Sequence, residues 1–216
     1  MVIERKNYIV DYDEKDKYIS DIIEYLDNKS NEILDFFELK ELKRQRKIVI
    51  YNDIEKYKKH MEKYSKYYDY MCADTNDGNI NTLSLEEAHK TKTHADMTID
   101  DLKRVIAHEF VHICQQDCEI EPIEETIGWF WEALATNLGN PERRNKIEIE
   151  ATNNDIINFN SLPNNYLIAF IIGNYMLQIY SHDQILDYIK YPQKLLNDSD
   201  EILNNAREWS KKIKAK

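Results

Sequence analysis

Two histidines and a glutamate near the middle of the chain have the spacing of a metal site. Residues 107–112 read AHEFVH, so His108 and His112 are four positions apart and Glu109 follows the first of them. On an α-helix these positions share a face, and the two imidazoles supply half of a tetrahedral zinc site. Glu109 would lie about 100° round the helix, within reach of a water molecule at the metal, as a metal-dependent hydrolase requires. Two partly buried polar histidines would give the same pattern.

A solitary glutamate in a second segment supports the first interpretation. Residues 126–138, TIGWFWEALATNL, are apolar almost all round a helix, and Glu132 is their only charge. A carboxylate in a buried helix is costly unless it is paired or binds a cation. Nineteen residues separate His112 from Glu132, enough for the chain to turn and return antiparallel. A His–His–Glu set leaves one zinc position open, as in catalytic sites. The alternative is an ion pair of Glu132 with Arg143 or Arg144.

On these motifs the chain resembles the gluzincin metallopeptidases, that is, the thermolysin-like enzymes and the aminopeptidase N group. The resemblance rests on HEFVH, the nineteen-residue spacing and the glutamate of WFWEALA. It implies that His108, His112 and Glu132 bind Zn²⁺. It also implies that Glu109 is the general base, which takes a proton from the attacking water and passes it to the leaving amine. The fold it implies is zincin-like, with an active-site cleft between two lobes.

Two further segments are similar to gluzincin elements. Residues 161–177, SLPNNYLIAFIIGNYML, resemble a stretch in which a tyrosine opens a helix and stabilises the oxyanion, and the matching residue is Tyr166. Tyr175 and His182 are alternatives for this role, and an ordinary aromatic residue fits Tyr166 equally well. Residues 80–85, INTLSL, match the edge strand that holds the substrate backbone, although a purely structural strand is equally consistent.

The chain also departs from the family pattern at two points. It lacks the GxMEN motif of the aminopeptidases, which argues against an aminopeptidase. Four residues beyond Glu132 it has Thr136, where some gluzincins carry an acid that orients a zinc-bound histidine. The hydrogen bond that orients a zinc-binding histidine must therefore come from another residue or be weaker.

The helices and strands that would position these residues are predicted from the sequence pattern. Strands in the N-terminal half and helices in the C-terminal half indicate an α+β fold, with a small mixed β-sheet and a helical C-terminal lobe. Thr98 and Asp101 form a capping box that begins a helix carrying AHEFVH to about Cys118. We expect one catalytic domain, 1–216, with sublobes of about 1–118 and 119–216. Strands are predicted at 7–12, 47–51, 70–73 and 80–85, and further helices at 15–39, 54–67, 124–138, 165–180, 182–190 and 199–212.

The composition narrows the classes of partner and compartment. The 40 acidic and 29 basic residues give a net charge of −11, which argues against nucleic acid and anionic membranes as main partners. The first residues lack the apolar stretch of a secretion signal, and the longest apolar run, LIAFIIG, is too short to span a bilayer. Three cysteines, Cys72, Cys114 and Cys118, do not suggest a disulfide framework, so we expect a reducing cytoplasm.

The sequence therefore predicts a zinc-dependent peptidase that hydrolyses a peptide or a flexible protein segment by way of a water activated by zinc and Glu109. The alternative is a non-catalytic protein of gluzincin fold that binds a peptide or regulates a partner. The presence of Glu109 argues against that alternative, because a binding protein has no need of a general base.

Overall fold

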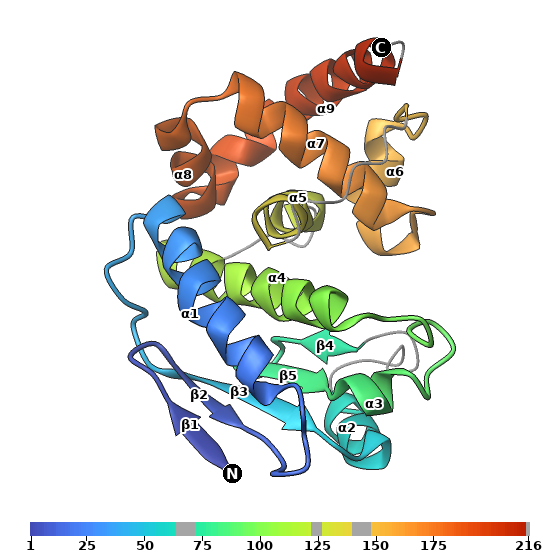
Figure 1. Ribbon diagram of the computed structural model, residues 1–216. Helices are drawn as coiled ribbons and strands as arrows, with labels where there is room; N and C mark the ends of the chain where they lie inside the picture. Colours follow the sequence, from blue (N-terminus) through green and yellow to red (C-terminus); the bar gives the residue numbers. More distant parts are fainter. Residues whose placement is uncertain (64–71, 122–126, 140–147, 215–216) are drawn as a thin grey trace. The chain divides into compact units, whose positions relative to one another are not determined.

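The computed structural model describes residues 1–63, 72–121, 127–139 and 148–214. The chain divides into two compact units, Met1–Asp117 and Cys118–Lys216. The first unit combines a β-sheet with helices, and the second is helical in the part that the structure describes (Figure 1). The predicted α+β class is confirmed.

The sheet of the first unit is mixed and follows the order β1-β2-β3-β5-β4. Its strands are β1 (Val2–Glu4), β2 (Tyr8–Asp11), β3 (Arg46–Tyr51), β4 (Ala73–Asp74) and β5 (Ile80–Leu83). The inner strands β2, β3 and β5 are parallel, and β1 and β4 pair antiparallel at the two edges. Alternate residues of β2 and β3 point into the core, which is the pattern of a sheet covered on one face.

One expectation about this sheet is wrong. Residues 80–85 do not provide an edge strand, because β5 pairs with β3 on one side and with β4 on the other. The physical reason is the turn-rich stretch between β4 and β5, in which Gly78 adopts a positive φ of 74°. It closes a hairpin, and the first strand of that hairpin takes the edge position.

The described helices of the first unit are α1 (Ile19–Phe36), α2 (Ile54–Met61), α3 (Leu85–Ala88) and α4 (Ile99–Cys118). The last residue of α4, Cys118, belongs to the second unit. Helix α4 begins at the predicted capping box. The Thr98 hydroxyl accepts from the Asp101 N–H at 3.1 Å, and the Thr98 N–H donates to the Asp101 carboxylate at 2.9 Å. Burial alone would raise the pKa of Asp101, but hydrogen bonds from Thr98 and Arg104 lower it, so the cap stays charged.

Helices α1 and α4 lie on the same face of the sheet (Figure 1). Tyr8 of β2 connects them, because its ring meets Phe110 of α4 edge-on at 6.5 Å and its hydroxyl donates to Asp27 of α1 at 2.5 Å. The far end of α4 is tied to β3 by a buried ion pair, in which Arg46 donates to Asp117 at 2.5 Å. Asp117 also accepts the backbone N–H of Lys43 at 2.6 Å. The helix that carries AHEFVH is therefore held to the sheet near its middle and at its C-terminal end.

The second unit is built from helices around α5. Its described elements are α5 (Gly128–Gly139), α6 (Asn153–Ile157), the 3-10 helix η3 (Phe159–Ser161), α7 (Asn165–Ile179), α8 (His182–Lys190) and α9 (Pro192–Lys214). Helix α7 packs directly on α5, and the Asn137 amide of α5 donates to the Phe170 carbonyl oxygen of α7 at 2.9 Å. Gly173 of α7 faces the Ala133 carbonyl group so closely that no Cβ would fit.

Most predicted elements agree with these bounds, with three kinds of exception. Helix α9 begins at Pro192 and not near residue 199, while β1, α3, α6 and η3 were not predicted. Parts of three predicted elements, at 64–67, 70–71 and 124–126, lie outside the described residues. Within the described chain, no helix combines the length and apolar character that crossing a membrane requires.

Candidate metal centre

The two histidines of AHEFVH meet on one face of α4. Their Nε2 atoms are 3.1 Å apart, and the rings are nearly perpendicular at a centroid separation of 4.8 Å. Both side chains are partly buried. Zinc–nitrogen bonds of about 2.0–2.1 Å in a tetrahedral site place two ligand nitrogens roughly 3.3 Å apart. The observed separation therefore suits two ligands of one metal ion.

The second ring nitrogen of His112 has a buried neighbour. Nδ1 of His112 lies 2.7 Å from Oε1 of Gln115, which is fully buried one turn further along α4. Sequence reasoning missed Gln115, although its spacing of three residues from His112 is a helical signal that could have identified it.

The charge of Glu109 affects two buried groups from other parts of the first unit. Burial, and then the charge of Glu109, raises the pKa of the Cys72 thiol to about 12. Burial also raises the pKa of Tyr57 on α2, with further contributions from Asp74, Cys72 and Glu109. Neither Cys72 nor Tyr57 was expected near the site. Only the tertiary structure brings them within range of the Glu109 charge, so no local pattern could have identified them.

Glu132 lies in the middle of α5, in the second unit. The side chain is partly buried, and the helix around it is almost wholly buried, including Trp129 and Trp131. The predicted setting of a single carboxylate on an apolar helix is therefore present. The alternative partners Arg143 and Arg144 lie outside the described residues.

Tyr166, the predicted oxyanion ligand, stands near the beginning of α7, also in the second unit. It is 42% exposed, and its ring meets Phe159 edge-on at 5.9 Å. Of the two alternatives, Tyr175 is buried against Tyr180 and Trp209, whereas His182 is the exposed first residue of α8.

Within the first unit the structure brings together His108, Glu109 and His112. Glu132 and Tyr166 belong to the second unit, and their roles at the site stay predictions.

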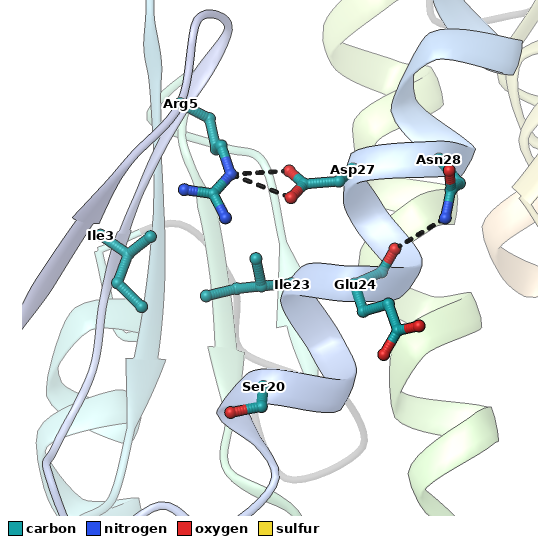
Figure 2. Close-up of a pocket in the computed structure, with 7 residues that line it drawn as sticks. All are labelled: Ile3, Arg5, Ser20, Ile23, Glu24, Asp27 and Asn28. Atoms are coloured by element: carbon teal, nitrogen blue, oxygen red, sulfur yellow. Dashed lines mark hydrogen bonds and ion pairs between the residues drawn. The ribbon is translucent and has the colours of Figure 1, made fainter.

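A separate pocket in the first unit has a different character. It has a volume of about 430 Å³ between β1 and α1 and is lined by Ile3, Arg5, Ser20, Ile23, Glu24, Asp27 and Asn28 (Figure 2). The Arg5 guanidinium donates to both carboxylate oxygens of Asp27 across it, at 2.9 and 3.0 Å. The pocket is open, it contains none of the candidate ligands, and its one basic residue, Arg5, is already paired with Asp27, so it is no part of the candidate site.

Comparisons of the chain with protein-family models, with curated proteins and with solved structures found no match.

Proposed function

We propose that the protein is a zinc-dependent peptidase with a gluzincin-like site. His108 and His112 would bind the ion through Nε2, and Glu132 would bind it through one carboxylate oxygen. The observation that carries the proposal is the Nε2–Nε2 separation of 3.1 Å, with Glu109 next to one of the two histidines in the chain.

The chemistry of the donor set also supports the proposal. His108, His112 and Glu132 each offer one atom of a kind that metal ions accept, and two imidazoles with one carboxylate are typical of catalytic zinc. Three protein ligands leave a position for water or substrate. When bound, zinc would polarise the scissile carbonyl group and make the attacking water more acidic.

Glu109 would do the proton transfer. Its carboxylate takes a proton from the attacking water and delivers it to the nitrogen of the leaving amine, so one residue serves both halves of the reaction. In this proposal Tyr166 donates a hydrogen bond from its hydroxyl group to the oxyanion of the tetrahedral intermediate. The substrate is a peptide or a flexible protein segment.

The place of action that we propose is the cytoplasm. All three cysteines are buried thiols in the structure, which fits a compartment where thiols stay reduced.

The proposal is tested on the full chain by a comparison of wild type with Glu109→Gln. We expect elemental analysis to find close to one zinc per chain in both proteins, since Glu109 is not a ligand. A peptide mixture from a digested denatured protein, read by mass spectrometry, should show new cleavage products only with wild type. Loss of the general base should slow cleavage by about 10²–10⁴-fold.

Asp100→Asn is the matched control, because it also removes one negative charge from α4 but at an exposed position near the helix start. It should cleave as wild type does. Equal cleavage by Glu109→Gln and wild type would show that Glu109 is not the base. A wild type that binds peptide but cleaves nothing would favour the non-catalytic binding protein, and a wild type that takes up no zinc would refute the peptidase.

A further inference from the structure

We infer that Gln115 is a positioning residue for His112: it accepts a hydrogen bond from Nδ1–H of His112 and so keeps the Nε2 lone pair available for a metal ion. The purpose of this arrangement rests on the proposed zinc site. The hydrogen bond itself belongs to the first unit alone and exists without a metal.

The contact has the geometry of a firm hydrogen bond. Oε1 of Gln115 is 2.7 Å from Nδ1 of His112, and Gln115 is fully buried, so water does not compete for this oxygen. An amide oxygen can only accept, and therefore the bond requires the proton on Nδ1. A neutral imidazole with its proton on Nδ1 has an unprotonated Nε2, which is the form that binds a metal ion.

The position of His108 agrees with this tautomer. Nε2 of His108 lies 3.1 Å from Nε2 of His112, so one of the two nitrogens must carry the proton of any hydrogen bond between them. If Gln115 holds the His112 proton on Nδ1, then His108 is the donor in the metal-free protein. To bind a metal ion through Nε2, a neutral His108 would have to move this proton from Nε2 to Nδ1, whereas His112 would already have its Nε2 lone pair available.

Thr136 of α5 does not orient a metal ligand, because its hydroxyl group is hydrogen-bonded within α5. Thr136 stands where some gluzincins carry an acid, but its hydroxyl donates to the Glu132 carbonyl oxygen at 2.6 Å, and the Ala133 carbonyl oxygen is 3.2 Å away. Its only proton is used within its own helix. Metal-binding histidines generally donate their second N–H to a carbonyl or carboxylate partner, and for His112 Gln115 supplies that partner from the same helix.

The test uses two substitutions of Gln115 in the full chain. Gln115→Met keeps the length of the side chain and removes the acceptor, whereas Gln115→Glu keeps an acceptor oxygen. Gln116→Met is the matched control, because it makes the same change at the adjacent position. Nitrogen-15 NMR of the metal-free proteins, at a pH where His112 is neutral, reports which ring nitrogen carries the proton, and a His112→Ala variant assigns the signals. Competition with a chelator gives the zinc affinity.

We expect wild type, Gln115→Glu and Gln116→Met to carry the His112 proton on Nδ1, and Gln115→Met to lose this preference. Zinc affinity should fall by about 10–100-fold in Gln115→Met and stay close to wild type in the other two. A wild-type His112 protonated on Nε2 would overturn the inference, as it would mean that the Gln115 amide donates instead. An unchanged tautomer and affinity in Gln115→Met would overturn it as well.

The design separates this inference from the proposed function. If wild type takes up no zinc, the peptidase proposal fails, while the tautomer measured without metal still decides the role of Gln115. If Gln115→Met does not fold, the other two proteins still test the inference. A His112 proton on Nδ1 in both wild type and Gln115→Glu supports it, and a proton on Nε2 in wild type overturns it.

Discussion

At the scale of single residues, the thiol of Cys72 reports on the surroundings of Glu109. Cys72 is 5% exposed, and burial together with the charge of Glu109 raises its pKa to about 12. Because the thiolate is the reactive form, native Cys72 should resist alkylation by iodoacetamide at neutral pH and react only as the pH approaches 12. Mass spectrometry of the labelled peptide measures this.

The matched variant for this prediction is Glu109→Gln, which removes the nearby negative charge and leaves the thiol buried. Its Cys72 should begin to react at a lower pH than in wild type, yet still above the ordinary thiol value of 9.0, since burial is the larger cause. Rapid labelling of native wild-type Cys72 at neutral pH would contradict the prediction. Labelling after denaturation confirms that the cysteine is reduced.

The sequence could predict those residues of the candidate site that lie close together on one helix, but not those that come from other parts of the chain. His108 and His112 could be predicted, because a separation of four residues on a helix fixes their proximity. Gln115 follows the same geometry. Cys72 and Tyr57 come from outside α4, and the influence of the Glu109 charge on them depends on the tertiary structure of the first unit, which no spacing in the sequence expresses.

At the scale of elements, the contact between α5 and α7 depends on the absence of a side chain at Gly173. A Cβ there would come within 3.0 Å of the Ala133 carbonyl carbon and oxygen, distances that real Cβ atoms essentially never show. Gly173→Ala should therefore lower the free energy of unfolding by about 1–3 kcal/mol, because α5 and α7 must move apart. Urea unfolding followed by circular dichroism measures the change.

Gly128→Ala is the control for this prediction. Gly128 begins α5, and a Cβ at that position meets nothing within 4 Å. The substitution should leave stability unchanged or raise it by up to about 1 kcal/mol, since alanine is the better helix former. The idea of a tight α5–α7 contact would be refuted if the two variants unfolded at the same urea concentration.

Two of the helices that the sequence predicted well begin with a capping box, although α7 was predicted equally well without a side-chain cap and α6 was missed despite its own capping box. Thr98 begins α4, and Ser181 forms a capping box with Gln184 at the start of α8. Helix α9 was placed too late, although Pro192 as its first residue is a recognised signal. The position of β5 inside the sheet could not be predicted, because strand order depends on which hairpin takes the edge and not on the residues of β5.

At the scale of the whole molecule, the proposed ligands come from both units. His108 and His112 belong to the first unit and Glu132 to the second. Sequence spacing could predict only that Glu132 has enough chain to reach the histidines. A ligand that binds only the folded protein stabilises every part that must be folded for binding. If all three residues bind one zinc ion, zinc therefore stabilises both units together.

We therefore expect zinc to raise the unfolding temperature of the wild type as a single transition, by an amount that grows with free zinc. At 100 times the dissociation constant the stabilisation should be about 2.7 kcal/mol. Differential scanning calorimetry with and without zinc measures it. Glu132→Ala should lose most of this stabilisation, with the gain of each protein measured against its own unfolding temperature without zinc. Equal stabilisation of wild type and Glu132→Ala would mean that the histidines of α4 bind the metal without the second unit, and the three-ligand site would then be wrong.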